Sequence, residues 1–254
     1  TSGCAAPGGF SVRSDAAACA RAANGIYPQQ VMLHTQDIVS GTVSDNPAPG
    51  SESSLDQQVL RTDVSGMPLE GVGYRDAVRL ICLDQISYSL GRTVFRIRGG
   101  VNALTGVRSA IEVRAIIASQ GTHPHAHLFS SSYTPPLSNQ ALFRRDQSLC
   151  LYCGERFPNA LLSRDHVKPL SQGGADSWVN VVTACKRCNN FKAGRTPEEA
   201  GMELLAIPFK PTHAEYVYLQ GRRILADQME FLLSHFPRNS RLRKRVERGE
   251  KLLV

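Results

Sequence analysis

Four cysteines form two close pairs whose spacing is typical of a metal site. Cys150 and Cys153 are separated by two residues, and so are Cys185 and Cys188. Two intervening residues let a tight turn direct both sulfur atoms at one ion, and zinc prefers four such ligands in a tetrahedron. The 31 residues between the pairs are enough for a hairpin to return. The sequence therefore predicts a structural Zn²⁺ site, with a redox dithiol or coincidence as the alternatives.

Other residue types suited to chemistry lie between and beside these pairs. A zinc ion with four cysteine ligands has no open position for water, so this ion should not be catalytic itself. Asp165 and His166 are adjacent, and on an extended segment their side chains point to opposite faces. Asn180 follows before the second pair. Asn189 and Lys192 come after it, three residues apart and so on one face of an expected helix.

These residue types fit the hydrolysis of a phosphodiester bond. An imidazole has an ordinary pKa of about 6.5 and can take a proton from water near neutral pH. Carboxylate and amide oxygens suit an ion such as Mg²⁺, which would stabilise the phosphate and the departing oxygen. An Asp–His pair by itself is more often a surface or hydrogen-bonding detail, so the wider pattern has to decide.

The wider pattern resembles the HNH endonucleases, whose core is a ββα-metal finger. The matching motifs are CxYCG from Cys150, DHVxPxSxGG from Asp165, WxNVVTAC from Trp178 and CxxCNxxK from Cys185. These motifs are numerous, ordered and properly spaced, and they lie within residues 141–200, about a quarter of the chain. The region before them more loosely resembles the accessory unit that precedes this module in many bacterial members.

The resemblance implies a role for each chemical residue. It implies that Asp165 and Asn189 hold a catalytic divalent ion, Mg²⁺ or Mn²⁺, and that His166 is the general base that activates the attacking water. It further implies that Asn180 ties a loop down and orients His166, and that Lys192 lies near the scissile phosphate. The expected products carry 5′-phosphate and 3′-hydroxyl ends. A structural Asn180 and a solvated Lys192 remain the alternatives.

The surrounding elements predict an α+β fold. Apolar periodicity and turn residues indicate the following elements. They are strands over 29–34, 93–98 and 107–119, helices over 74–85 and 212–236, a helical turn over 141–146 and a helix that starts at Thr196. Together with the resemblance, they predict an HNH finger with a Cys4 zinc site, preceded by a small α/β accessory unit and followed by a C-terminal helix.

Composition shifts divide the chain into five expected parts. They are a poorly ordered tail (1–28), an accessory or target-recognition unit (29–129), a linker (130–140), the HNH nuclease module (141–200) and a helical extension with a basic tail (201–254). His123, His125 and His127 alternate near the linker, which more often marks a polar loop than a metal site.

Positive charge is concentrated in the second part of the chain. Residues 1–140 contain 10 Arg, no Lys and 10 acidic residues, so the net charge of +7 falls entirely on residues 141–254. A basic half suggests a polyanionic partner, and DNA is the expected one. Candidate phosphate contacts, or else solvated side chains, are Arg144, Arg145, Lys186, Arg187 and the basic tail from Arg238 to Lys251.

Composition also excludes several classes of protein. No apolar run approaches the roughly 20 residues of a membrane-spanning helix, so we expect no association with a membrane. The first residues lack the pattern of a secretory signal, so we expect a cytoplasmic, reducing location in which paired cysteines bind metal. A hydrophobic content of 42% with 20% charged residues excludes a wholly disordered chain.

The sequence thus predicts a divalent-metal-dependent endonuclease that hydrolyses DNA. By family analogy alone, its setting is bacterial or phage defence, restriction or mobile-element biology. A non-catalytic zinc module that binds nucleic acid and an RNA-directed nuclease are the alternatives. The sequence leaves the target sequence, the oligomeric state and the preferred ion open.

Overall fold

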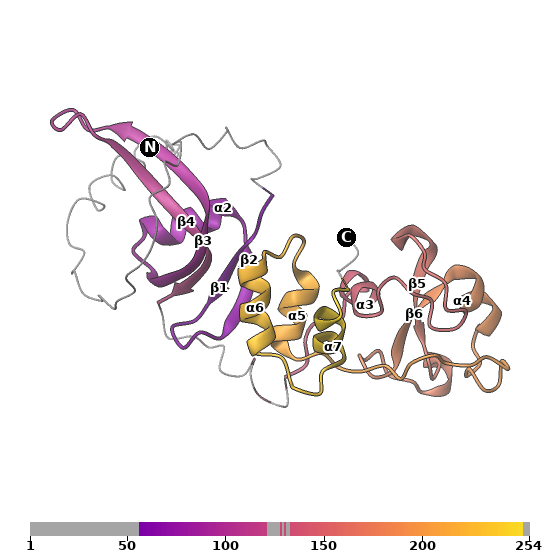
Figure 1. Ribbon diagram of the computed structural model, residues 1–254. Coiled ribbons are helices and arrows are strands. Elements are labelled where there is room, and N and C mark those ends of the chain that lie inside the picture. The colour runs from indigo at the N-terminus through magenta and orange to yellow at the C-terminus, as the bar shows by residue number, and fades with distance from the viewer. Residues whose placement is uncertain (1–55, 121–127, 129, 131–132, 251–254) are drawn as a thin grey trace, which may run out of the picture.

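The computed structural model describes residues 56–120, 128, 130 and 133–250, in an α+β arrangement (Figure 1). The expected tail, the strand over 29–34 and the three alternating histidines lie outside these residues. Within them, no helix is long and apolar enough to cross a membrane.

The N-terminal part is a four-stranded sheet in the order β2-β1-β4-β3. Its strands are β1 (Val59–Thr62), β2 (Pro68–Val72), β3 (Ile86–Val101) and β4 (Arg108–Ser119). β1 runs antiparallel to β2 and parallel to β4, and β3 and β4 form a long antiparallel hairpin. The expected strand over 93–98 is therefore only the middle of β3. Glycines at 91, 99 and 100 and register shifts interrupt its alternation, which hid its length in the sequence.

One face of this sheet is covered by α2 (Tyr74–Cys82), which confirms a helix in this region. Its buried Ala77 packs with Val59, Phe95 and Val113 of the sheet. The helix ends before the expected residue 85 because Asp84 adopts a left-handed conformation, with φ of 55°.

The expected helix over 212–236 is two helices, α5 (His213–Gln220) and α6 (Ala226–Ser234). The first helix ends at Gly221, where an added Cβ would lie 2.7 Å from the side chain of Ile224. Both helices lie between the N-terminal sheet and the cysteine-containing region (Figure 1). They share one core with both parts, which includes Leu60 and Ile116 of the sheet, Leu142, Val181, Leu219 and Leu232.

The basic tail is also more structured than expected. Arg241–Glu247 form a further helix, α7, whose Leu242 is buried in the same core. Arg243 pairs with Glu247 at 2.9 Å, and the Arg245 guanidinium donates to the carbonyl of Arg145. This segment is therefore docked on the protein rather than a solvated extension.

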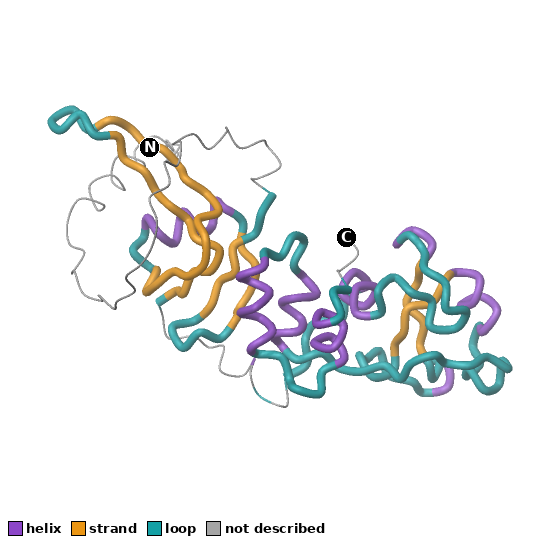
Figure 2. Tube along the Cα trace, in the orientation of Figure 1, coloured by secondary structure: helices purple, strands orange, loops and turns teal. Residues whose placement is uncertain are grey.

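The cysteine-containing region is built on α3 (Asn139–Arg145), β5 (Leu162–His166), β6 (Val181–Cys185) and α4 (Lys186–Lys192). β5 and β6 pair antiparallel, and α4 follows β6 without a loop and contacts both strands (Figure 2). The expected helix from Thr196 is a single turn. Thr196 and Glu199 exchange both hydrogen bonds of a capping box, but Gly201 then turns the chain with φ of 64°.

Arg144 and Arg145 are neither phosphate contacts nor solvated side chains. Arg144 donates to the carbonyls of Leu219, Gln220 and Gly221, at the end of α5. Arg145 is 1% exposed and pairs with Asp146 at 2.8 Å. Its guanidinium also donates to the carbonyls of Trp178, Phe209 and Val181. It therefore joins α3 to two other segments of the chain, residues 178–181 and the segment that contains Phe209.

Replacement of this buried guanidinium should cost substantial stability. Arg145→Met leaves the Asp146 carboxylate without its charge partner and three carbonyls without a donor, so we expect a loss of about 3 kcal/mol. Urea denaturation followed by circular dichroism measures it. The exposed Arg187→Met is the matched control and should change the unfolding free energy by less than about 0.5 kcal/mol. Equal effects in the two variants would contradict this role for Arg145.

Candidate functional site

The two cysteine pairs meet in one cluster. Their four sulfur atoms lie within 4.8 Å of one another. Cys150 and Cys153 belong to the turn after α3, Cys185 ends β6, and Cys188 lies in the first turn of α4. Cys150, Cys185 and Cys188 are buried, and Cys153 is half-buried. Such a cluster could hold a metal ion, and four thiolates in this arrangement are typical of zinc.

The pKa values of the cysteines indicate how metal binding would change their protonation. Burial and the neighbouring cysteines raise the pKa of Cys188, and burial raises the pKa of Cys153. At Cys150, burial is outweighed by backbone hydrogen bonds, and the pKa is lowered. Without a cation, the cluster therefore favours the thiol form of Cys153 and Cys188. Because metal binds the thiolate, binding would release protons from these residues.

Asp165 lies in β5 and points inward, toward α4. The residue is 5% exposed. Its Oδ1 is 3.1 Å from the Nζ of Lys192, and its Oδ2 accepts a hydrogen bond from the hydroxyl of Tyr152. Burial and the carboxylate raise the pKa of Tyr152, so the phenol keeps its proton and donates it. Both carboxylate oxygens of Asp165 are thus engaged by side chains of the protein.

Lys192 is fully buried and is not a solvated helix residue. Besides its contact with Asp165, its ammonium donates to the backbone carbonyl of His166 at 2.8 Å. The last residue of α4 therefore contacts both predicted chemical residues of β5, Asp165 through its carboxylate and His166 through its backbone carbonyl. Lys192 therefore lies beneath the site, where its ammonium is paired with the Asp165 carboxylate and the His166 carbonyl.

The side chain of His166 points to the other face of β5, as expected for the neighbour of Asp165. It is 19% exposed, and its Nε2 is 2.9 Å from the Oδ1 of Asp176. Arg164 approaches both oxygens of Asp176, at 3.0 and 2.9 Å. Slight burial raises the pKa of Asp176, but the hydrogen bonds from Arg164 and His166 outweigh it and lower the pKa below its usual range. Asp176 is therefore ionised at neutral pH.

Asp176 and Tyr152 are residues that the sequence analysis missed. Asp176 lies ten residues after His166, next to the glycine pair of the loop, and Tyr152 lies inside the first cysteine motif. Both stood in segments already singled out, but neither spacing indicated a contact with His166 or Asp165.

Asn180 ties down the loop that follows His166. Its Oδ1 accepts from the backbone nitrogen of Lys168 at 2.9 Å, and its Nδ2 donates to the carbonyls of Lys168 and Ala175. At Gly174 an added Cβ would lie 1.9 Å from the carbonyl oxygen of Lys168, so only glycine fits this approach. The geometry is that of a loop fastened at both ends by one carboxamide.

Asn189 lies on α4 opposite β5. Its Nδ2 donates to the Oγ of Ser163 at 2.9 Å and approaches the carbonyl of Arg164 at 3.4 Å. Ser163 and Asp165 share a face of β5, so Asn189 and Asp165 both lie at the interface between this strand and α4. One carboxylate and one amide suit a hard divalent ion in kind. At Asp165, such an ion would compete with the ammonium of Lys192.

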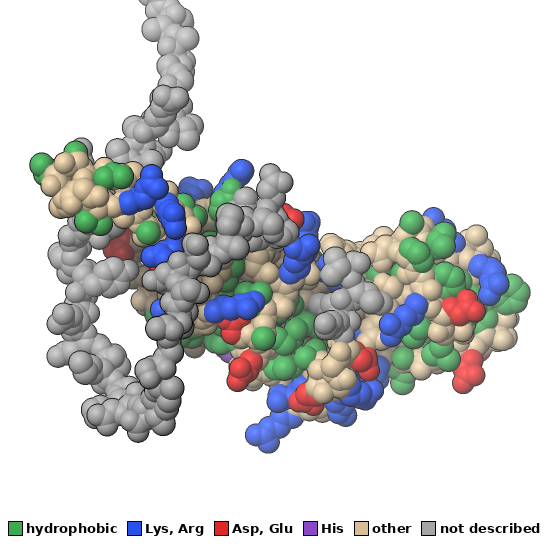
Figure 3. Space-filling view, turned by 45° about the horizontal axis from the view of Figure 1, so that its top comes forward, with side chains coloured by type: hydrophobic (Ala, Val, Ile, Leu, Met, Phe, Trp, Pro, Cys, Tyr) green, Lys and Arg blue, Asp and Glu red, His purple; other side chains and the backbone are tan. Residues whose placement is uncertain are grey.

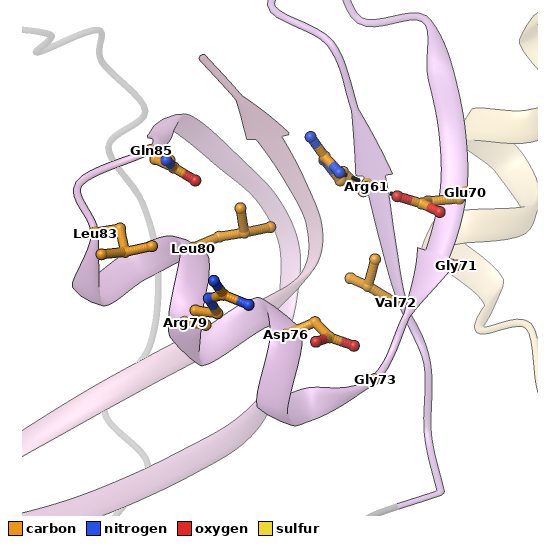
Figure 4. Close-up of a pocket in the computed structure, with 10 residues that line it drawn as sticks. All are labelled: Arg61, Glu70, Gly71, Val72, Gly73, Asp76, Arg79, Leu80, Leu83 and Gln85. Atoms are coloured by element: carbon orange, nitrogen blue, oxygen red, sulfur yellow. Dashed lines mark hydrogen bonds and ion pairs between the residues drawn. The ribbon is translucent and has the colours of Figure 1, made fainter. Parts of the chain in front are cut away.

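A separate cavity of about 430 Å³ lies in the N-terminal sheet, between α2 and the strands β1 and β2 (Figure 4). Two basic and two acidic residues line it, Arg61, Arg79, Glu70 and Asp76, and Arg61 pairs with Glu70 at 3.0 Å. Its charges balance, and none of the predicted site residues lines it.

Comparison with known families agrees with the motif analysis. Residues 150–205 match the HNH endonuclease family, a span that begins at Cys150 and includes β5, β6 and α4. The predicted resemblance is therefore confirmed for this segment, and it indicates a nuclease-type function, that is, a hydrolase. No curated protein matches the chain.

Removal of metal should unfold the cysteine-containing region. A structural zinc ion of this kind contributes on the order of 10 kcal/mol, so a chelator should strongly lower the thermal midpoint of unfolding. Calorimetry of the purified protein, with zinc quantified by mass spectrometry, measures both quantities. Added Zn²⁺ should restore the midpoint, and added Mg²⁺ should not. A metal-free protein with an unchanged midpoint would contradict the zinc site.

The buried pair of Asp165 and Lys192 should behave as a coupled unit. Lys192→Met and Asp165→Asn each remove one partner, and each should cost about 3 kcal/mol of unfolding free energy. The double variant should lose about 1–3 kcal/mol less than the sum, because no charge is then left unpaired.

The exposed Lys186→Met on the same helix is the control for this cycle and should be near neutral. Strictly additive effects, measured by urea denaturation, would show that the two side chains do not interact.

Proposed function

We propose that the protein is a divalent-metal-dependent endonuclease that hydrolyses phosphodiester bonds of DNA, with His166 as the general base. The observation that carries this proposal is the contact of the His166 Nε2 with Asp176, 2.9 Å away, inside a segment that matches a nuclease family. An imidazole oriented by a carboxylate is the arrangement that general-base catalysis needs.

The contact with Asp176 assigns the proton on the imidazole ring. An ionised carboxylate can only accept a hydrogen bond, so Nε2 of a neutral His166 must carry the proton and donate it. Nδ1 is then the nitrogen with a lone pair, which can take a proton from the attacking water. The imidazolium formed in this way is stabilised by Asp176, and Arg164 holds Asp176 in place.

The remaining residues of the site position this base. Lys192 fixes the carbonyl of His166, and Asn180 fixes the loop that carries Asp176. We propose Asp165 and Asn189 as the ligands of the catalytic Mg²⁺ or Mn²⁺, and the four cysteines as those of a structural Zn²⁺. The catalytic ion, when bound, supplies neutralisation of the phosphate charge and of the departing oxygen.

Two other functions remain candidates, and each has its own discriminating result. A non-catalytic zinc module would explain the cysteine cluster but gives no reason for the Arg164–Asp176–His166 arrangement. An RNA-directed nuclease would use the same site residues, and competition between DNA and RNA substrates separates it from a DNA nuclease.

Cleavage of supercoiled plasmid tests the proposed activity. Wild-type protein should nick or linearise DNA with Mg²⁺ or Mn²⁺ and not without them, and His166→Ala should lose about 10²- to 10⁴-fold in rate. His235→Ala, which alters a histidine in a distant part of the fold at the end of α6, is the matched control and should cleave normally. Full activity in His166→Ala would refute the assignment of the base.

Asp176→Asn tests the orientation of the imidazole. The amide can no longer stabilise the imidazolium, so kcat should fall by about 10²-fold while KM stays close to the wild-type value. Steady-state kinetics on a labelled duplex measure both constants. Glu155→Gln, an exposed carboxylate in the turn after Cys153, is the control. A change in KM alone would assign Asp176 to substrate binding instead.

A further inference from the structure

The hairpin of β3 and β4 projects as an arm from the N-terminal sheet. Its base is covered by α6 on one face and by α2 on the other, and its distal half extends beyond these helices (Figures 1 and 2). The tip is a turn from Asn102 to Val107. At this tip Leu104 is 96% exposed, with Val101 and Val107 exposed beside it.

Four arginines share one face of this arm. Arg96 and Arg98 of β3 stand opposite Glu112 and Ala110 of β4. Arg108 and Arg114 lie on the same face of the arm, because each is two residues from Ala110 or Glu112 along β4 and side chains two residues apart on a strand share a face. All four are exposed. We call Arg96, Arg98, Arg108 and Arg114 the arginine face.

The positive charge of this face is largely uncompensated. Arg96 is 3.5 Å from Glu112. The side chains of Arg98, Arg108 and Arg114 have no ion pair with any residue in the described part of the chain. Residues 86–119 contain five Arg and one Glu, a local excess that the zero net charge of residues 1–140 conceals. Basic side chains gather along the arm (Figure 3).

The opposite face of the arm is apolar and serves packing. Phe95 and Val113 are buried there against α2, with Ile97 and Ile111 partly buried beside them. The alternation therefore separates a face that stabilises the fold from a face that nothing in the described fold requires. Unpaired arginines in such a position fit a polyanionic partner.

We propose that the arginine face binds the phosphate backbone of duplex DNA, with the arm lying in a groove. The major groove of B-form DNA is about 12 Å wide and admits a two-stranded β-ribbon. In duplex RNA this groove is deep and too narrow for side chains to read, so the shape of the arm favours DNA. The proposal deepens the proposed nuclease function, because it names where the substrate is held, but it concerns binding alone.

Salt-dependent binding tests the arm independently of cleavage. The affinity of His166→Ala protein for a labelled DNA duplex is measured by fluorescence anisotropy over a range of KCl, without added divalent ion. Adding Arg98→Gln and Arg108→Gln should weaken binding and reduce the slope of log K against log salt by about 1.8, since each phosphate contact contributes about 0.9. The matched control adds Arg75→Gln and Arg79→Gln, two exposed arginines of α2 on the other side of the sheet. This control should leave the slope unchanged.

The outcomes separate this inference from the nuclease proposal. An equal loss in both pairs of variants, or no loss in the arm variant, overturns the inference, provided that both keep the parent's thermal midpoint. The same loss on duplex RNA of matched length overturns the commitment to DNA. If the wild-type protein cuts no plasmid but the arm variant still loses DNA binding, the nuclease proposal fails and this inference stands.

Discussion

The meeting of four cysteine sulfurs is the constraint on which the candidate site depends. Cys185 ends β6 and caps α4, so one residue fixes the angle between the strand and the helix that follows it. That angle places Lys192 under β5, where it engages Asp165 and the carbonyl of His166. Four neighbouring thiolates would repel one another unless a cation lay between them. The positions of the site residues therefore depend on the integrity of the cysteine cluster.

Two layers of charge follow from this arrangement. Beneath β5, the buried pair of Lys192 and Asp165 is closed off from solvent. Above it, Arg164, Asp176 and His166 form a partly exposed chain in which both Arg164 and His166 contact the carboxylate of Asp176. The alternation of side chains along one strand separates the two layers. An inward carboxylate with a resident ammonium and an outward imidazole with its own carboxylate can thus occupy adjacent positions without neutralising each other.

The sequence predicted features that depend on local spacing. The meeting of the cysteine pairs and the opposite directions of Asp165 and His166 are both found, and so is the loop fastened by Asn180, which the family resemblance implied. It missed contacts that depend on how distant segments pack. Arg145 and Lys192 were expected to lie near phosphate or in solvent, because the burial of a charged residue cannot be predicted from a basic segment. Asp176 needed the loop geometry to reach His166. The sequence analysis missed the arginine face because it summed the net charge over residues 1–140. In a strand, alternate side chains point to opposite faces, so one face can be basic although the net charge of the segment is zero.

Chemical rescue tests whether His166 acts as the general base. His166→Gly removes the imidazole and leaves space for a free one. We expect this variant to be nearly inactive on duplex DNA with Mg²⁺, and added imidazole to restore cleavage in proportion to its concentration. Cleavage by His166→Gly at the wild-type rate without imidazole would show that His166 is not the base.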